Sequence, residues 1–246
     1  MARILFVAQD KGGSGKSTAV RALAEAVPGI AIVEIDSTHR LIEFDAGRGK
    51  APRQVQFFPM RASRVAIEAS GGAAARAEFD PVIEAIAKAS GPTVVDIGAN
   101  TSASLLELVS DLAADLKGDG HILGVQVVVT SEPGAVAEVP RLLGLAKPWA
   151  DALFLLENQK AGALDARQFA ALGEGTTVSR FRAQAMEAKA TEILQGRGLH
   201  DIPDLDYGAL KTEFGLALAS RIRADLLRFR MEAMEAVRDA ATWLVS

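Results

Sequence analysis

The chain contains no cysteine, and this absence excludes several kinds of chemistry at once. Without thiolates the protein cannot form disulfides, bind zinc through cysteine or ligate an iron–sulfur cluster. Its histidines, His39, His121 and His200, stand far apart in the sequence and suggest no metal site. No apolar run approaches the ~18–20 residues that a membrane-spanning helix needs.

The sequence has no large excess of charge of either sign, because the formal net charge is only −4 over 246 residues. Such a balance gives no global attraction to nucleic acid or to anionic membranes, so any binding of that kind needs a local patch. Apolar residues make up 49% of the chain, which is ample for a hydrophobic core. We expect one domain over residues 1–246, with helices from about 207 to 246. The chain opens directly on an apolar strand with no signal peptide, so we expect a cytoplasmic protein.

The most informative segment is 10–18, which reads DKGGSGKST. An apolar run at 4–8, typical of a buried parallel strand, precedes it. Apolar residues with helical spacing follow it, from Val20 to Val27. A strand, a glycine-rich loop and a helix N-terminus together bind phosphate, because loop N–H groups converge on the anion and the helix dipole favours negative charge.

This loop predicts a site for ATP or ADP with Mg²⁺. Lys16 should reach the β- and γ-phosphates, and the Ser17 hydroxyl should hold the metal. The glycines permit backbone angles and a close approach that a Cβ would block. The predicted nucleotide-binding residues are Lys11, Gly12, Gly13, Ser14, Gly15, Lys16, Ser17 and Thr18.

Strands and helices alternate along the chain. This pattern predicts a doubly wound, mainly parallel α/β sheet flanked by helices, the P-loop NTPase fold, with ligands beyond the carboxyl ends of the strands. Strands are expected at 4–8, 29–36, 54–60, 93–96, 123–130, 152–156 and 199–202. Helices are expected directly after the phosphate loop and at 62–71, 78–88 and 102–116. Another should follow the strand at 123–130 and end at about 146. Further helices are expected at 164–171, at 182–195 and, in two pieces, from Tyr207 onward.

Acidic residues follow two of these strands. Asp96 ends the run Val94-Val95-Asp96, which resembles a Walker B strand, where an acid holds Mg²⁺. Asp36 ends the strand at 29–36, and we expect it to be part of the metal site with Ser17 and Asp96. The residues 97–100 after Asp96 should form the loop that senses the γ-phosphate.

The phosphate loop departs from the usual G-x-x-x-x-G-K-[ST] pattern, because Asp10 replaces the first glycine and Lys11 opens the loop. This form resembles the deviant Walker A motif of the ParA/MinD family of ATPases. The resemblance implies an ATP-dependent sandwich homodimer in which Lys11 reaches the partner subunit's phosphates. It also implies a slow, Mg²⁺-dependent ATPase, stimulated by a protein partner, that partitions or positions DNA or a large cellular assembly. Catalysis would rest on Lys11, Lys16 and Asp36.

Two further residues are assigned through the same resemblance. Glu34-Ile35-Asp36 matches the family's D-x-D, with Asp36 near Mg²⁺ and the attacking water. An alternative register places Asp36 first and Thr38 second, which removes the water-orienting acid. Asn158 stands where the family places an asparagine on the adenine edge, although a turn-forming asparagine fits equally well.

Two basic segments are candidates for nonspecific DNA binding, since a dimer doubles a modest patch. The candidates are Arg48, Lys50 and Arg53, together with Arg221, Arg223, Arg228 and Arg230. Such binding would make the protein nucleoid-associated in a bacterium. The MinD branch instead ends in a membrane-seeking helix. Here the last basic residue is Arg238, ahead of the apolar end, so we expect no membrane attachment.

Other functions remain open at this point. A P-loop enzyme of the dethiobiotin-synthetase type would transfer phosphate to a small substrate as a constitutive dimer. A nucleotide-sensing adaptor with weak hydrolysis would follow from the Thr38 register. Residues 96–100 and the apolar segment after them also resemble a plasmid-partition and conjugation-stability branch of the ParA/MinD family.

Overall fold

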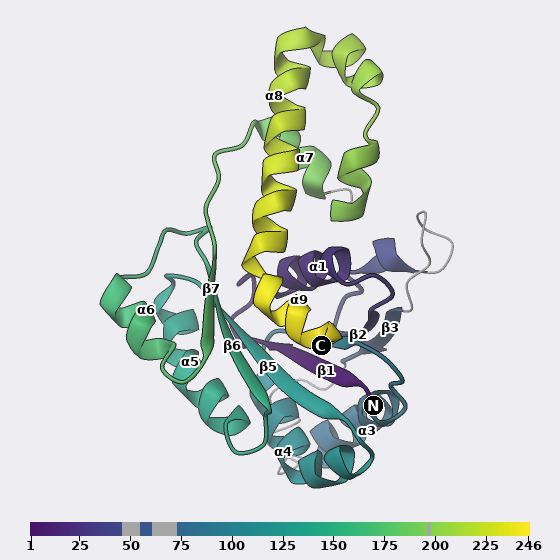
Figure 1. Ribbon diagram of the computed structural model, residues 1–246, viewed down its shortest axis with the longest axis vertical. Helices are drawn as coiled ribbons and strands as arrows, with labels where there is room; N and C mark the ends of the chain where they lie inside the picture. Colours follow the sequence, from purple (N-terminus) through teal and green to yellow (C-terminus); the bar gives the residue numbers. More distant parts are fainter. Residues whose placement is uncertain (46–54, 61–72, 196–197) are drawn as a thin grey trace.

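The computed structural model describes residues 1–45, 55–60, 73–195 and 198–246. Its centre is a seven-stranded sheet in the order β3-β2-β4-β1-β5-β6-β7, in which every pair of neighbours is parallel (Figure 1). The strands are β1 Arg3–Ala8, β2 Ala31–Asp36, β3 Val55–Pro59, β4 Thr93–Ile97, β5 Ile122–Val129, β6 Ala152–Asn158 and β7 Thr177–Phe181. The predicted parallel P-loop NTPase fold is therefore confirmed.

The register of the sheet sets the site. Val7 of β1 and Glu34 of β2 both pair with Asp96 of β4, so Glu34 and Asp96 point to the same face near the strand ends. The strands of a parallel sheet covered on both faces are apolar throughout, and β1 is buried from Ile4 to Ala8. A polar residue inside such a strand therefore needs a specific partner.

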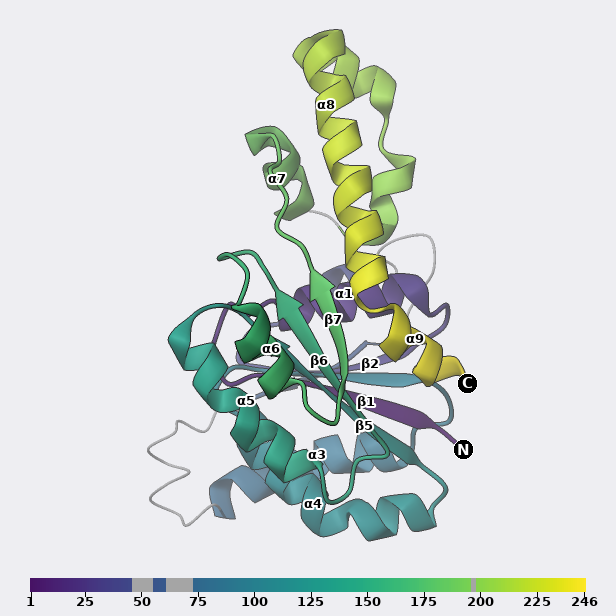
Figure 2. The same ribbon diagram turned by 60° about the vertical axis from the view of Figure 1, so that its left-hand side comes forward.

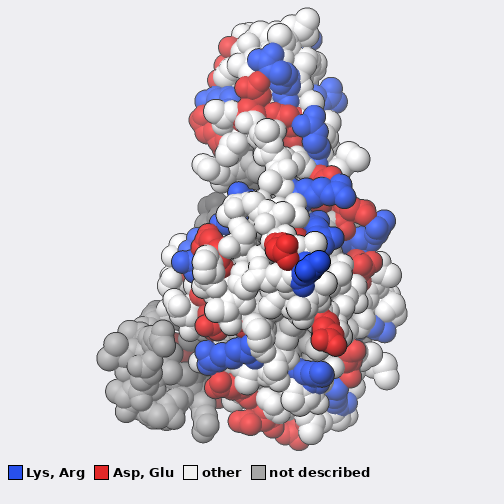
Figure 3. Space-filling view, turned by 90° about the vertical axis from the view of Figure 1, so that its left-hand side faces the viewer, with Lys and Arg blue, Asp and Glu red and all other residues white. Residues whose placement is uncertain are grey.

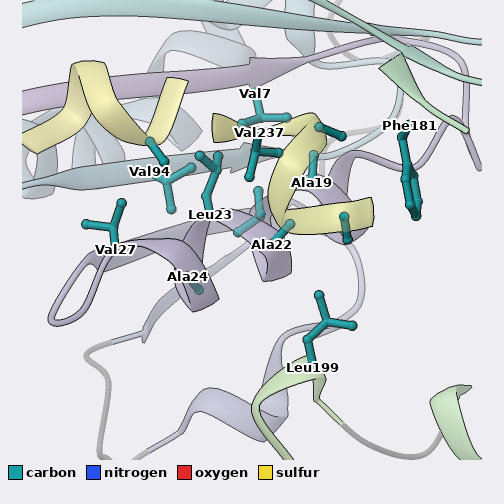
Figure 4. Close-up of a cluster of buried hydrophobic side chains, with 14 of the residues drawn as sticks. Val7, Ala19, Ala22, Leu23, Ala24, Val27, Val94, Phe181, Leu199 and Val237 are labelled. Atoms are coloured by element: carbon teal, nitrogen blue, oxygen red, sulfur yellow. The ribbon is translucent and has the colours of Figure 1, made fainter. Parts of the chain in front are cut away.

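Helices cover both faces of the sheet (Figures 1 and 2). Helix α1 (Lys16–Ala26) and α9 (Arg238–Val245) lie on one face with the end of α8. Helices α3 (Ala73–Ala87), α4 (Ser102–Gly118) and α5 (Pro133–Ala146) cover the other, joined by Phe169 of α6 (Ala166–Leu172). Figure 4 shows the α1 side of the core, where Leu23, Val7, Val94 and Val237 gather in one cluster.

A helical arm extends beyond the sheet (Figures 1 and 2). It consists of α7 (Ala188–Gln195), the 3₁₀ helix η2 (Leu199–Asp204) and most of α8 (Tyr207–Ala236). A further 3₁₀ turn, η1 (Ile42–Phe44), follows β2. Helix α8 is interrupted at Gly215, whose φ of 75° is the left-handed conformation that glycine adopts readily. The predicted helical tail thus has this break in addition to the one at Val237.

The apolar end of the chain packs on the sheet. The Trp243 ring of α9 lies over Gly124 of β5, where a Cβ would come within 2.7 Å of the indole. Phe154 contacts the same ring from the side, and Leu244 is buried. In the described part of the chain, no helix combines the length and apolarity needed to cross a bilayer.

Three elements differ from the sequence prediction. Strand β7 was not predicted, and the helix expected at 182–195 begins only at Ala188. The strand expected at 199–202 is wrong, because this segment is the 3₁₀ helix η2, whose buried Leu199 and Ile202 are three residues apart, as on one face of a helical turn. The helix expected at 62–71 lies outside the described residues.

Candidate nucleotide-binding site

The phosphate loop connects β1 to α1 and borders an open cavity of ≈ 440 Å³, a volume suited to a nucleotide. The lining runs from Gly12 to Thr18 and adds Arg21, Asp36, Arg40 and Ala99. Gly13 and Gly15 have φ values of 73° and 101°, which strain any residue with a Cβ. The predicted loop residues from Gly12 to Thr18 are therefore brought together around one cavity.

Lys16 is buried at the start of α1, and its Nζ donates to the Gln9 carbonyl at 2.7 Å. Burial lowers the pKa of Lys16, while the charges of Asp96, Asp10 and Asp36 oppose this shift. The carboxylates thus favour the charged form that a phosphate requires.

Asp96 and Ser17 provide a donor set that fits Mg²⁺. Asp96 is buried, and its Oδ1 has no hydrogen-bond partner in the described structure. Burial raises its pKa to about 7, against the Ser17 hydroxyl and the Lys16 charge, which lower it. An orphaned carboxylate oxygen beside a hydroxyl is a suitable place for a hard cation with oxygen ligands. These two residues would hold the metal.

Asp36 ends β2 and lines the same cavity as the phosphate loop. Its Oδ1 accepts from the Ser37 hydroxyl and the Thr38 N–H, and its Oδ2 lies 3.1 Å from Nε of Arg40. The carboxylate therefore borders the cavity in an ion pair. Thr38 itself is exposed. The role of Asp36 in orienting water remains a prediction.

Glu34 fixes the segment that follows Asp36. Its fully buried carboxylate accepts from the N–H groups of Arg40 and Leu41 at 2.6 and 3.2 Å, and from the His39 ring at 2.5 Å. Burial raises the pKa of Glu34, and these hydrogen bonds oppose the shift. Burial lowers the pKa of His39, but bonds to Glu34 and Asp45 outweigh this and raise it. Glu34 therefore has a structural role in this conformation.

The Lys11 side chain contacts Glu132 rather than the cavity lining. Its Nζ lies 3.6 Å from Oε2 of Glu132, just before α5, and its side chain is 50% exposed. Among the described cavity-lining residues, Lys11 does not appear although Gly12 to Thr18 all do.

Asn158 supports the phosphate loop from the end of β6. Its Nδ2 donates to the Ser14 carbonyl at 2.9 Å, and its Oδ1 accepts from the Lys160 N–H. The Lys160 ammonium in turn donates to the Gly13 carbonyl. Asn158 is buried with both ends of its amide engaged, and its contact with adenine remains a prediction.

The hydrogen bonds that hold the phosphate loop in place were not predicted from the sequence. The Asp10 carboxylate, in the loop after β1, accepts from the N–H groups of Ser102 and Ala103 and so caps α4. The Gln9 N–H donates to the Ser102 hydroxyl, and its amide donates to the carbonyls of Val128 and Ala135. The one signal in the sequence was the acid in place of the first glycine.

No family model matches the chain. Protein TraL of Escherichia coli is 29% identical over 168 residues, which is 63% of this chain and 62% of TraL. The chain thus matches less than two thirds of the length of that relative.

Two solved structures are similar to the chain at low sequence identity. The MinD cell division protein of Aquifex aeolicus has a TM-score of 0.48 at 15% identity, covering 92% of this chain and 96% of that one. An ATP complex of McdA from Cyanothece has a TM-score of 0.46 at 13% identity, covering 93% and 96%. The phosphate loop, with its added lysine, lies between β1 and α1 as the motif requires. The chain has the P-loop NTPase fold.

The DNA binding predicted from the sequence would need a basic surface. Arg48, Lys50 and Arg53 lie outside the described residues. Most of the C-terminal arginines have acidic partners: Arg221 pairs with Glu187, Arg228 with Asp225 and Arg230 with Glu25, while Arg223 lies over the Tyr207 ring. Figure 3 shows the two signs of charge interleaved over the arm. The arm thus presents mixed charge on that face.

Proposed function

We propose that the chain is an ATPase switch: it binds ATP with Mg²⁺, closes into a sandwich of two subunits, and opens after hydrolysis. The position of Lys11 carries the proposal. Every residue from Gly12 to Thr18 lines the cavity, whereas Lys11 extends over the surface to Glu132. Lys11 lies next to the phosphate site but does not line it. Its positive charge is therefore available to the phosphate site of a second subunit.

The contact that holds Lys11 is weak enough to exchange. Both partners are exposed and their charged atoms are 3.6 Å apart, so the pair contributes at most about 1 kcal/mol. A phosphate of the partner subunit carries more charge and would be met in a dry interface, where the attraction is stronger. ATP would therefore shift Lys11 from Glu132 to the interface.

Within one subunit, the remaining groups divide the work. The loop N–H groups and Lys16 bind the phosphates, and Lys16 stabilises charge that develops on them. Ser17 and Asp96 would hold Mg²⁺, which neutralises phosphate oxygens when bound. Asp36 would orient the attacking water from the end of β2.

Light scattering after size-exclusion chromatography, with ATP·Mg²⁺ or with ADP, tests the switch. We expect a dimer with ATP only. Lys11→Ala should bind ATP and stay monomeric, and Asp36→Ala should accumulate as the dimer because hydrolysis is blocked. Lys117→Ala is the matched control, because Lys117 is an exposed lysine paired with Asp151. Dimerisation of Lys11→Ala equal to that of Lys117→Ala would contradict the proposal.

We further propose that the dimer positions DNA or a large assembly. A gel-shift titration of nonspecific duplex DNA at low salt, with ATP·Mg²⁺ and with ADP, tests the DNA form of this idea. A shift with ATP only supports DNA as the surface on which the dimer rides. No shift in either state rejects it and directs the search to a protein partner of the Asp36→Ala dimer.

A further inference from the structure

The cavity lining carries more positive charge than the loop alone explains. Lys16, Arg21 and Arg40 face one acid, Asp36. The arginines were not assigned any role from the sequence. Both belong to the wall around the cavity, and their chemistry suits an anion with several oxygens.

The two arginines differ in how firmly they are engaged. Arg21 is fixed on α1: its Nε pairs with Oε1 of Glu43 at 2.5 Å, and its Nη2 donates to the Arg40 carbonyl at 2.6 Å. The Arg40 guanidinium instead forms an ion pair with Asp36, with Nε 3.1 Å from Oδ2, and its side chain is 56% exposed. Arg40 is therefore the cation that can change partner at low cost.

The backbone of Arg40 is held in place while its side chain stays free to move. Its N–H is bound by the buried Glu34 carboxylate at 2.6 Å, and its carbonyl by Arg21 at 2.6 Å. A guanidinium on a fixed Cα reaches the same small region each time, which lowers the entropy cost of binding an anion there. The buried Glu34 network thus positions the Arg40 side chain at the cavity wall.

We propose that Arg40 binds the terminal phosphate of ATP in its own subunit and leaves Asp36 when it does so. The loop N–H groups would enclose the inner phosphates, so a cation that lines the cavity outside the loop is placed to meet the outermost one. A guanidinium forks onto phosphate as it does onto carboxylate, so the two anions compete for it. Release of Asp36 by ATP would free that carboxylate to orient water, which links recognition of the third phosphate to hydrolysis.

This inference rests on the proposed function and is tested by the difference between nucleotides. Titration calorimetry with a non-hydrolysable ATP analogue and with ADP, both with Mg²⁺, measures the two affinities of the Arg40→Ala variant. Loss of a charge-assisted hydrogen bond should lower the affinity for the ATP analogue by roughly tenfold or more. The affinity for ADP should change by less than about twofold. Arg40→Lys should fall between, since it keeps the charge and loses the fork.

Arg141→Ala is the matched control, because Arg141 of α5 is 57% exposed, pairs with Glu107 of α4 and Glu138 of α5, and stands outside the described cavity lining. Thermal melts without nucleotide check the fold of Arg40→Ala, whose backbone contacts do not involve the side chain. Repeating the titrations in the Lys11→Ala background isolates the contact within one subunit from dimerisation.

The outcomes separate the two proposals. A loss of affinity for the ATP analogue but not for ADP in Arg40→Ala supports the inference. Equal losses for both nucleotides, or affinities equal to those of Arg141→Ala, overturn it and leave the proposed function intact. A wild-type protein that binds neither nucleotide overturns both.

Discussion

Gly15→Ala should destabilise the protein far more than the same change three residues earlier. Gly15 has φ of 101°, and a Cβ there would lie 2.2 Å from Nδ2 of Asn158. Gly12 has an ordinary φ, and its Cβ would meet only Ala99 Cβ at 3.6 Å, a normal contact. The two substitutions add the same methyl group to the same loop, so their difference isolates geometry.

The magnitude follows from two contributions. A left-handed alanine costs roughly 1–2 kcal/mol. Moving Asn158 aside breaks its 2.9 Å hydrogen bond to Ser14, and a buried carbonyl left without a partner costs about 1–3 kcal/mol. Gly15→Ala should therefore lower the free energy of unfolding by about 2–5 kcal/mol, and Gly12→Ala by less than about 0.5 kcal/mol.

Urea unfolding followed by circular dichroism measures both values. The Asn158→Ala/Gly15→Ala pair adds a double-mutant cycle: since Asn158→Ala removes the clashing amide, the double variant should be less destabilised than the sum of the singles. Equal stabilities for Gly15→Ala and Gly12→Ala, or strict additivity in the cycle, would refute the reasoning.

Three further predictions concern the surroundings of the site. The pKa of His39 is raised, so the stability contributed by its charge is fully present below about pH 6.5 and is lost as the pH rises through the raised value. Urea unfolding from pH 5.5 to 8.5 should show this decline in the wild type. The profile of His39→Gln should be flatter. Asp10→Ala should lower the free energy of unfolding by about 1–2 kcal/mol, because it removes the cap of α4. Asp10→Asn should keep most of that stability. Equal losses of stability in the two variants would show that the cap is unimportant. Gly124→Ala should push the Trp243 ring off the sheet, seen as a red shift of tryptophan fluorescence. Gly118→Ala, with open space around its Cβ, should leave the spectrum unchanged.

The sequence was sufficient where local pattern and tertiary structure agree. The strands beside the phosphate loop are continuous apolar runs, and parallel strands buried on both faces take that form. The glycine pattern identified the loop because its left-handed conformations favour glycine. Asp36 and Asp96 were placed correctly at strand ends, because an α/β sheet brings those ends to one edge.

The sequence was insufficient where a partner far along the chain decides the structure. In β7 only Phe181 is buried, so the strand lacks an apolar signal and depends on its pairing with β6. The Glu34 side chain matched an acidic motif, yet its partners are backbone N–H groups of a loop that sequence cannot position. Lys160 meets the Gly13 carbonyl only because β6 ends beside the loop.

The phosphate loop is tied to both helices that begin beside it on the opposite face of the sheet. Asp10 caps α4, and the Gln9 amide bonds the carbonyl of Ala135 in α5. Lys11 then reaches Glu132, the residue before α5. Three successive residues thus connect the loop to two helix N-termini, so a loop that moved on binding ATP would carry strain directly to α4 and α5. The acid at position 10 therefore links the nucleotide site to the helices, a connection that a glycine at that position would lack.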